Sequence, residues 1–471
     1  MSRVGAWGHM ACVAGVVVLA GCAAQNDLQN QLKPVAAERW GLAASAPDGV
    51  SAAQAWWTQW HDPTLNALIE QALHEHPGMQ GAAARVRLAQ AALGHAEAAD
   101  TPQIQARAAV DRQHFTEHGL YPHPVAGASL SSGTLQLEGR WEADLFGRQR
   151  AQLQAAVGQH KAAIADEQAA RVLLSAQVAR AYVQLGRLQA QRAVLTRALA
   201  QRQEVLNLIQ QRVQAGIDTL VEQRQGEGAL PDARQQIASL DEQIVLTRHQ
   251  LAALTAQAMD ALNRLEPAWS TLQVSAAPAV VPMNLLGQRA DVMALRWRAE
   301  AAGAQSDAAR TLFYPNLNIQ AYLGLNAIGL DRLFQSGSQQ WGLMPAIDLP
   351  LFDGDRRRAN LKSHLAEQDA AVASYNQAVI DAVREVADQV GSVQSIDRQQ
   401  QEQAQAQQAA ESAYDVAVQR YRAGLGPYLS VLSAEAAVLN QRRLAVDLKA
   451  RALDARVGLI RSLGGHWPAQ P

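Results

Sequence analysis

The chain has 471 residues, a formal net charge of −2 and only 5% aromatic residues. This near-neutral balance argues against a nucleic-acid partner, because proteins that neutralise phosphates carry a strong basic excess. The abundance of Ala and Gln, together with the few aromatic side chains, favours long helices over a compact aromatic core.

The N-terminus has the features of an export signal. Arg3 supplies the basic start, residues 11–20 are an apolar stretch, and Leu19-Ala20-Gly21-Cys22 stands where cleavage is expected. This tetrapeptide resembles a bacterial lipobox, in which the cysteine is lipidated after cleavage. Ala23 follows in place of Asp, so the resemblance implies sorting to the outer membrane.

We therefore predict a lipoprotein signal peptide over residues 1–21 and lipidation at Cys22. The alternative is an ordinary signal peptide that happens to end near a cysteine. Cys12 leaves with the signal in either case, so the mature chain has at most one cysteine and forms no internal disulfide.

A polar N-terminal arm, residues 22–61, leads into a predicted first repeat over 62–266. Asp62-Pro63 has the sequence of a helix start, with Asp as the N-cap and Pro in the first turn. Pro77 is expected to kink or divide this helix, and Thr101-Pro102 to end it.

A β-hairpin is predicted over 103–145. Apolar and polar residues alternate in both arms, and a period of two indicates strands with one apolar and one polar face. The apolar positions are Ile104, Ala106, Ala108 and Val110 in the first strand and Leu135, Leu137, Gly139, Trp141, Ala143 and Leu145 in the return strand. Residues 112–133, rich in Gly, Pro, Ser and His, are expected to form the loop between them.

A long helical hairpin is predicted over 148–262. Residues 148–215 contain no proline, and at ~1.5 Å per residue they make roughly 100 Å of helix. A partner helix is expected from about Thr219 to Leu262. A narrow apolar seam with a heptad period and otherwise polar faces is typical of a coiled coil.

The second half of the chain repeats this order. Residues 267–286 form a linker, and the second repeat spans 287–467. It contains a helix that opens near Arg289, a β-hairpin over 316–351 and a long helical hairpin over 356–464. We therefore predict two tandem copies of one unit.

After the signal, no stretch has the ~20 consecutive apolar residues of a membrane helix, whereas each predicted strand is long enough to cross a bilayer when tilted. We expect a mixed α and β membrane protein with four transmembrane β-strands and long coiled-coil helices per chain. Four strands cannot close a barrel, and open edges are not tolerated in lipid, so three copies would share a wall around a wet lumen. The alternative is two amphipathic hairpins that lie on a soluble helical protein.

Several short motifs, spread over nearly the whole mature chain, follow one another in the order found in a known family. They are Leu19-Ala20-Gly21-Cys22, Trp56-Trp57, Asp62-Pro63, Leu68-Ile69, Trp141-Glu142-Ala143-Asp144-Leu145-Phe146-Gly147, Arg289-Ala290-Asp291-Val292, Pro350-Leu351-Phe352-Asp353, Tyr421-Arg422-Ala423-Gly424 and Leu463-Gly464-Gly465-His466-Trp467. Together they resemble the TolC-like outer-membrane efflux proteins, and most of all the NodT-type lipoproteins of drug-efflux systems. Arg289-Ala290-Asp291 departs slightly from the usual Arg-Pro-Asp of that family.

The resemblance implies a homotrimer with a 12-stranded β-barrel in outer-membrane lipid and a periplasmic α-helical barrel. It implies an exit duct of a tripartite efflux pump, which exports drugs or other small toxic compounds. The implied partners are a periplasmic adaptor (membrane fusion) protein and an inner-membrane pump, and no cofactor is implied. A duct for protein secretion is the alternative within the same family.

The turns after the long helices are implied to form the periplasmic end, where the adaptor touches the chain. The expected contact residues are Ala215, Gly216, Ala423 and Gly424. Glycine at these positions also suits a helix C-cap that needs positive φ.

The resemblance places a constriction just past the second turn, where family members carry acidic residues. Ser430 and Ser433 occupy the matching positions here, and a ring of serines does not hold cations by charge as a ring of carboxylates does. Glu222, past the first turn, is a candidate to supply charge instead. We hypothesise a gate closed more by packing and neutral hydrogen bonds than by carboxylates, formed by Tyr421, Arg422, Tyr428 and Leu429.

Two rival interpretations belong to other classes. The first rival is an enzyme or metal protein, and the scattered histidines argue against it. His74 and His76 flank Glu75, but residues two apart do not lie on the same face of a helix. No catalytic or metal site is therefore predicted, although three histidines lie in the first hairpin's loop region. The other rival is a non-channel periplasmic coiled-coil lipoprotein or adaptor, which would have long helical hairpins without the repeated amphipathic strands.

Overall fold

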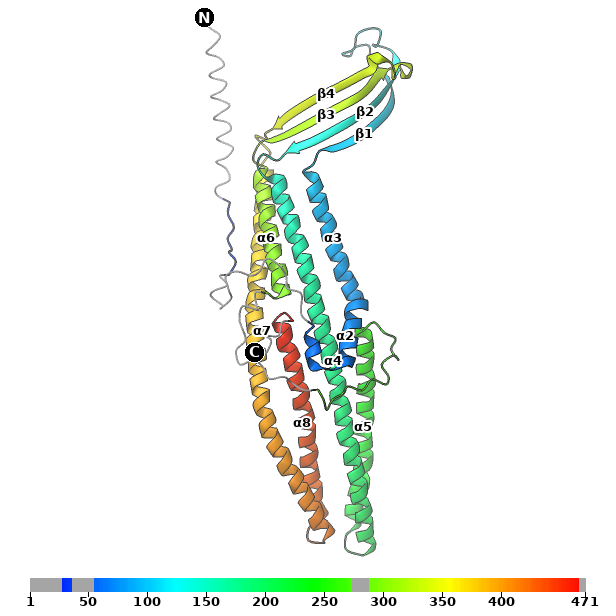
Figure 1. Ribbon diagram of the computed structural model, residues 1–471, viewed down its shortest axis with the longest axis vertical. Coiled ribbons are helices and arrows are strands. Elements are labelled where there is room, and N and C mark those ends of the chain that lie inside the picture. The colour runs from blue at the N-terminus through cyan, green and yellow to red at the C-terminus, as the bar shows by residue number, and fades with distance from the viewer. Residues whose placement is uncertain (1–27, 36–54, 273–287, 466–471) are drawn as a thin grey trace. The chain divides into compact units, whose positions relative to one another are not determined.

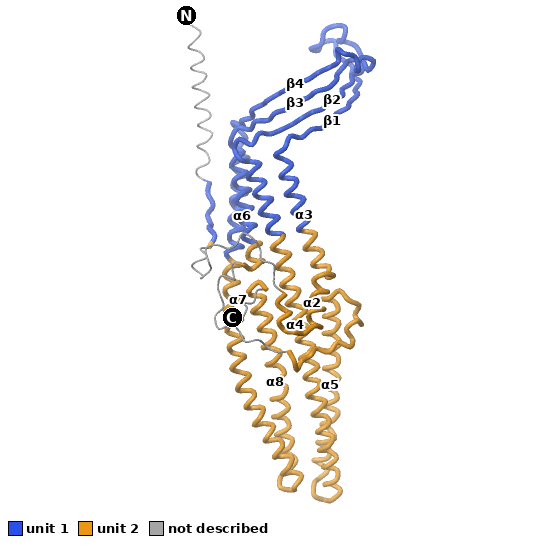
Figure 2. The backbone as a smooth tube through the Cα atoms, viewed as in Figure 1, with its two compact units in different colours: residues 1–34, 86–163, 295–376 blue, residues 35–85, 164–294, 377–471 orange. Residues whose placement is uncertain are grey.

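The computed structural model describes residues 28–35, 55–272 and 288–465 (Figure 1). The predicted signal peptide, Cys22, most of the N-terminal arm, most of the linker and His466-Trp467 lie outside the described residues. The chain divides into two compact units (Figure 2), one of residues 1–34, 86–163 and 295–376 and the other of residues 35–85, 164–294 and 377–471.

Long helices and one set of four strands make up the described chain. In order they are α2 Pro63–Glu75, α3 Pro77–Ala99, β1 Gln103–His114, β2 Ser129–Ala143, α4 Arg148–Gln214, α5 Leu220–Leu254, α6 Ala290–Thr311, β3 Asn316–Ile328, β4 Gln339–Asp348, α7 Arg356–Arg422 and α8 Tyr428–Ser462. A short 3-10 helix, Trp56–Trp60, precedes α2. This mixed α and β architecture with four strands confirms the predicted fold class.

The four strands form one antiparallel sheet in the order β1-β2-β3-β4. Gln103 pairs with Arg140 in the first hairpin, Leu135 with Leu325 across the centre, and Asn316 with Asp348 in the second hairpin. The two predicted hairpins therefore lie side by side and are joined through β2 and β3.

The strand bounds differ from the sequence prediction at the hairpin ends. β1 continues to His114 and β2 begins at Ser129, so the loop is shorter than the predicted 112–133. β4 ends at Asp348 rather than at 351. The loop is shorter because backbone pairing runs on through polar pairs such as Asp111 with Ser132, where the apolar alternation has already stopped. β4 ends at Asp348 because its partner there, Asn316, is the first residue of β3.

One face of the sheet is apolar and exposed. Directly opposed residues in antiparallel strands share a face, so Leu137, Leu323 and Trp341 form one apolar row across β2, β3 and β4. Trp341 is 78% exposed and Ile347, on the same face, is 73% exposed. Nothing in the described part of the chain covers these side chains, and an exposed apolar surface of this kind marks contact with lipid or another protein.

The opposite face of the sheet is polar and linked by side-chain hydrogen bonds. Gln105 Nε2 donates to Glu138 Oε2 at 2.8 Å, and Gln340 Nε2 donates to Gln136 Oε1 at 2.8 Å. Among the helices that the structure describes, no candidate for a membrane-spanning helix is found.

The two helical hairpins match in length. α4 and α7 have 67 residues each, and α5 and α8 have 35 each. α5 stops at Leu254, earlier than the predicted Leu262, because Thr255 caps it and Ala256 has φ +53. An L-residue in the left-handed region ends a helix.

The start of α2 forms as predicted and is anchored in the second unit. Asp62 Oδ1 accepts from the backbone of Thr64 at 2.9 Å, and Asp62 Oδ2 accepts from the Tyr182 hydroxyl at 2.7 Å. Burial and the hydrogen bond to Asp62 raise the pKa of Tyr182, so its hydroxyl stays protonated. Trp56, 1% exposed, donates its indole N–H to Ser175 at 3.2 Å.

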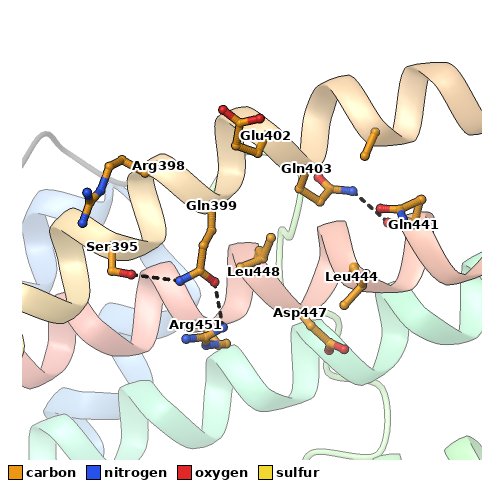
Figure 3. Close-up of a pocket in the computed structure, with 11 residues that line it drawn as sticks. Ser395, Arg398, Gln399, Glu402, Gln403, Gln441, Leu444, Asp447, Leu448 and Arg451 are labelled. Atoms are coloured by element: carbon orange, nitrogen blue, oxygen red, sulfur yellow. Dashed lines mark hydrogen bonds between the residues drawn. The ribbon is translucent and has the colours of Figure 1, made fainter.

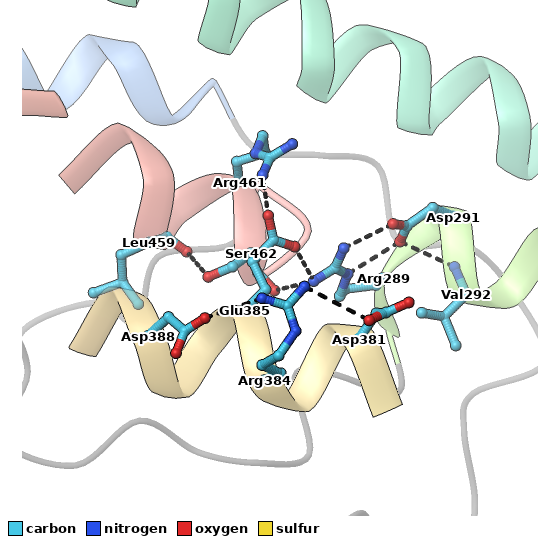
Figure 4. Close-up of polar contacts among 10 residues, drawn as sticks. All are labelled: Arg289, Asp291, Val292, Asp381, Arg384, Glu385, Asp388, Leu459, Arg461 and Ser462. Carbon is cyan, nitrogen blue, oxygen red and sulfur yellow. Dashed lines mark hydrogen bonds and ion pairs between the residues drawn. The ribbon is translucent and has the colours of Figure 1, made fainter. Parts of the chain in front are cut away.

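A buried ion network ties the start of α6 to α7 and the end of α8 (Figure 4). Arg289 donates to Asp291 at 2.7 Å, to Glu385 at 2.9 Å and to the backbone oxygen of Ser462 at 3.1 Å. Arg461 also pairs with Glu385. Since the Arg289 side chain is 9% exposed, its charge depends on these partners.

We predict that Glu385→Ala lowers the free energy of unfolding by roughly 3 kcal/mol, because it leaves the buried guanidinium of Arg289 without one partner. Urea unfolding of the detergent-solubilised protein measures this change. Arg384→Ala is the matched control: Arg384 is 66% exposed and pairs with Asp381 and Asp388 on the same helix, so its loss should cost less than ~1 kcal/mol. Equal effects of the two substitutions would contradict the prediction.

Candidate functional site

The two turns at the ends of the long helices have the same backbone form. Gly216 after α4 has φ +73, and Gly424 after α7 has φ +75. Ile217 N donates to Arg212 O at 2.8 Å, and Leu425 N donates to Arg420 O at 2.8 Å. Both turns are therefore glycine C-caps, as the sequence predicts.

A charged network joins the two turns, which we call the helix tips (212–222 and 420–433). Arg212 binds Asp218 through two hydrogen bonds, Nε to Oδ2 at 2.8 Å and Nη2 to Oδ1 at 3.1 Å. Arg212 Nη1 also donates to the backbone oxygen of Tyr421 at 3.0 Å, and the Tyr421 hydroxyl donates to Asp218 Oδ2. The guanidinium carbon of Arg212 lies 4.5 Å from the centroid of the Tyr421 ring.

The three groups hold one another in defined protonation states. The hydrogen bonds from Arg212 hold the pKa of Asp218 below its usual range and outweigh the opposing effect of burial. Burial, followed by the hydrogen bond to Asp218, raises the pKa of Tyr421. At neutral pH the carboxylate is therefore charged and the phenol is protonated, so the phenol donates and the carboxylate accepts.

Tyr421, a member of this network, also packs in an apolar cluster with Tyr428. Tyr421 is 1% exposed and Tyr428 is 5% exposed, and their ring centroids are 5.9 Å apart. Both belong to an apolar cluster that also contains Ile209, Tyr414, Val431 and Val438. The structure thus brings together two predicted gate residues, both buried within one chain.

The other predicted site residues lie on the surface of the tips. Arg422, Leu429 and Ser430 are exposed, and the exposed Ser433 donates its hydroxyl to Ser430 O at 3.1 Å. The expected adaptor contacts at the turns are exposed as well: Ala215, Gly216, Ala423 and Gly424.

Glu222 is engaged as a helix cap. Its carboxylate accepts from Thr219 N at 3.0 Å, and the Thr219 hydroxyl accepts from Val221 N, which completes a capping box. Hydrogen bonding to Thr219 lowers the pKa of Glu222, so it is ionised at neutral pH. The carboxylate that bridges the tips, Asp218, was not among the predicted site residues, although it stands two residues after the predicted turn glycine.

A second tie between the helical hairpins lies further along α4. Arg202 Nε donates to Glu435 Oε1 on α8 at 2.6 Å, and Nη1 donates to Ala229 O on α5 at 3.0 Å. The side chains of Arg202 and Glu435 are 15% and 10% exposed, so this pair is largely shielded from water.

Between α7 and α8 lies a groove of about 760 Å³, lined by polar residues such as Gln399 and Gln403 and by the apolar Leu444 and Leu448 (Figure 3). Gln403 Nε2 donates to Gln441 O at 2.8 Å, and Arg451 Nη1 donates to Gln399 Oε1 at 3.2 Å. Apolar clusters lie on both sides of this stretch of α7, around Val393 and around Tyr414.

Comparison with protein families finds one match that covers most of the chain. The family model "Outer membrane efflux protein" matches residues 68–257 and 281–465. Both matched segments include a β-hairpin and a long helical hairpin.

Individual relatives agree with this match. The chain is 32% identical to the multidrug resistance outer membrane protein MdtQ of Escherichia coli O157:H7, over 99% of this chain and 100% of the relative. Among solved structures, it is similar to the outer membrane protein VceC of Vibrio cholerae, with 35% identity, a TM-score of 0.83 and coverage of 88% of this chain and 98% of VceC. It is also similar to the outer-membrane channel OprN, with 28% identity, a TM-score of 0.82 and coverage of 93% and 97%.

We predict that the Asp218 network stabilises the fold equally from pH 8 down to pH 5. The pKa of Asp218 is depressed on folding, so its contribution is complete above the unfolded-state pKa of about 3.9 and is lost as the pH falls further. The difference in melting temperature between the native chain and Asp218→Asn, measured at several pH values, tests this. A difference that changes between pH 5 and pH 8 would rule out this assignment of charge.

Proposed function

Because this chain belongs to the outer membrane efflux protein family, we propose that three copies of it form the exit duct of a tripartite efflux pump. The observation that carries this proposal is the sheet with one exposed apolar face and one polar face. A sheet of this kind suits a wall between lipid and water. One chain supplies four strands, and three chains supply the twelve strands needed to enclose a wet lumen.

The helices continue this wall into the periplasm in our proposal. Each 67-residue helix extends for roughly 100 Å, and the repeats over 62–266 and 287–467 each contribute one helical hairpin. The pattern of buried residues on one side of α5 and exposed residues on the other supports helices that line water.

The exported compounds are proposed to be drugs or other small toxic molecules. The relatives MdtQ and MdtP are both named multidrug resistance outer membrane proteins, and each matches nearly the full chain. An inner-membrane pump would select the compound, and the duct would conduct it to the outside.

We place the contact with a periplasmic adaptor protein at the helix tips. Ala215, Gly216, Ala423 and Gly424 are exposed there, and apolar side chains flank them: Ile217, Leu220, Val221, Leu425 and Leu429. Exposed apolar side chains gathered at a turn favour a protein partner over water.

In place of the neutral gate hypothesised from the sequence, we propose that the Arg212–Asp218–Tyr421 network, which is centred on a carboxylate, holds the gate at rest. It links the end of the first helical hairpin to that of the second within one chain. Leu429, Ser430, Ser433 and Arg422, exposed on the second tip, would face the neighbouring chains at the constriction, and Tyr428 would brace them by packing. Glu222 would supply charge near this point.

We predict that Tyr421→Phe opens the duct, because it removes the hydroxyl that bridges the tips to Asp218. Single-channel conductance in planar bilayers should rise severalfold, since a hydrogen bond to a charged group contributes about 1.5–3 kcal/mol. Tyr414→Phe is the matched control: Tyr414 lies in the same cluster, and in the described structure its hydroxyl does not bridge the tips. If Tyr414→Phe opens the channel as much as Tyr421→Phe, packing rather than the network closes the gate.

We also predict that the mature chain begins at Cys22 and carries a lipid there. Mass spectrometry of the N-terminal peptide should give the mass of the cleaved chain plus its acyl groups. Cys22→Ser should abolish this modification, whereas Cys12→Ser, within the signal, should leave it unchanged. An unmodified N-terminus at another residue would overturn the prediction.

The experiment that tests the function uses a strain without its own outer-membrane efflux channels. Expression of this chain with its adaptor and pump should lower susceptibility to several unrelated drugs. Restored secretion of a protein substrate without any change in drug susceptibility would favour a secretion duct instead.

A further inference from the structure

A short piece of the N-terminal arm lies against the first part of α7. Residues 28–34 belong to the same compact unit as α7 up to Asn376. The side chain of Leu28 is partly buried and packs against an apolar cluster from α6 and α7, formed by Ala309, Leu361 and Leu365. Since Leu361 is 0% exposed, this cluster gives the arm a firm apolar contact.

One carboxylate of α7 binds the backbone of this segment. Leu32 N donates to Asp369 Oδ1 at 2.9 Å, and Gln31 N lies 3.1 Å from each of the two carboxylate oxygens. Further along α7, Asn376 Nδ2 donates to Lys33 O at 3.1 Å. Hydrogen bonds to an ionised acceptor are roughly twice as strong as neutral ones. Asp369 therefore holds the arm through its main chain, whatever its side chains are.

The contacts also give the direction of the arm. Leu28 packs against the cluster that contains Leu365, whereas Lys33 meets Asn376. From Leu365 to Asn376 the helix rises ~16 Å, and from Leu28 to Lys33 an extended chain covers ~17 Å. The arm is thus nearly extended and runs parallel to α7. Its N-terminal end points back toward Arg356, where α7 begins next to the strands.

The chain length before Leu28 limits how far Cys22 can lie from this contact. Leu28 stands six positions after Cys22, and six positions span at most about 20 Å. On α7, Leu361 follows the helix start at Arg356 by five positions, a rise of ~8 Å. Phe352, 92% exposed, stands four positions before that start. If Phe352 marks the lipid boundary, this boundary lies about 8 to 20 Å from the docked Leu28.

We propose that Asp369 docks the N-terminal arm on α7 and thereby fixes the depth at which the lipid on Cys22 holds the duct in the membrane. This inference rests on the lipidation of Cys22 proposed above. Six positions are enough for Cys22 to reach the lipid boundary while the arm stays docked. Two positions span at most about 7 Å and are not enough. The docked arm thus transmits the pull of the lipid anchor to α7.

Hydrogen exchange followed by mass spectrometry tests the docking in the full-length, detergent-solubilised protein. The amides of Gln31 and Leu32 should exchange at least tenfold faster in Asp369→Ala than in the native chain, because their acceptor is gone. Glu367→Ala is the matched control, since Glu367 lies on the same helix, is 56% exposed and pairs with His364. It should leave the exchange unchanged. Unchanged exchange in Asp369→Ala would overturn the docking.

The reach of the arm is tested by the same measurement on the protein in lipid nanodiscs. Deletion of residues 24–27 keeps the lipobox and Ala23 but places Leu28 two positions after Cys22. The lipid anchor and the docking cannot then be satisfied together, so the amides of Gln31 and Leu32 should exchange at least tenfold faster. Insertion of four Gly and Ser residues after Ala23 is the control, and it should leave the exchange unchanged because a longer arm still reaches the lipid.

Removal of the lipid separates the pull of the anchor from other effects of the deletion. The shortened chain, exported with an ordinary cleaved signal and therefore without a lipid, should exchange at the native rate. Fast exchange in this unlipidated chain, or slow exchange in the lipidated deletion variant, would overturn the proposed reach and leave drug export by the native chain standing. A native N-terminus without a lipid would overturn the lipidation and the reach together.

Discussion

Backbone pairing in lipid is the constraint on which the rest of this structure depends. A four-stranded sheet with an exposed apolar face suits lipid on that face, but each of its outer strands keeps one side of its backbone unpaired. Those groups are costly in hydrocarbon unless another strand supplies donors and acceptors. Because β1 and β4 lie at opposite edges of the sheet, a second copy of the same chain can supply these partners.

The internal repeat links this constraint to the helices. Each repeat contains one β-hairpin followed by one helical hairpin, and the matched lengths of α4 with α7 and of α5 with α8 give equal helical hairpins. Equal hairpins in turn place two similar glycine turns at the tips. One carboxylate, Asp218, then joins the two repeats there through Arg212 and Tyr421.

Alternation of apolar and polar residues predicted the strands because it reflects which face each side chain occupies. It missed the strand ends because Ser131, Ser132 and Gln113 pair through their backbones. Backbone hydrogen bonds form whatever the side chain, so the side-chain pattern does not reveal them. The predicted end of α5 was also wrong. The Ala-rich run after Leu254 favours a helix, but the backbone of Ala256 adopts a left-handed conformation there. Local propensity does not record such a tertiary constraint.

At the helix tips the sequence predicted the turns but not the bond between them. The turn glycines have a local signature, as does the Thr219–Glu222 capping box that engages a proposed gate carboxylate. Asp218 and Tyr421 lie 203 residues apart, so no local pattern relates them. Their meeting follows only from the repeat that brings both tips to the same end of the coiled coils.

The most direct measurement of the central claim is native mass spectrometry of the protein extracted from outer membranes in mild detergent. The account predicts a complex of three chains, each with its lipid, and no stable smaller species. A folded monomer that persists after the detergent is removed would contradict it, because its apolar face and both strand edges would then be stable in water.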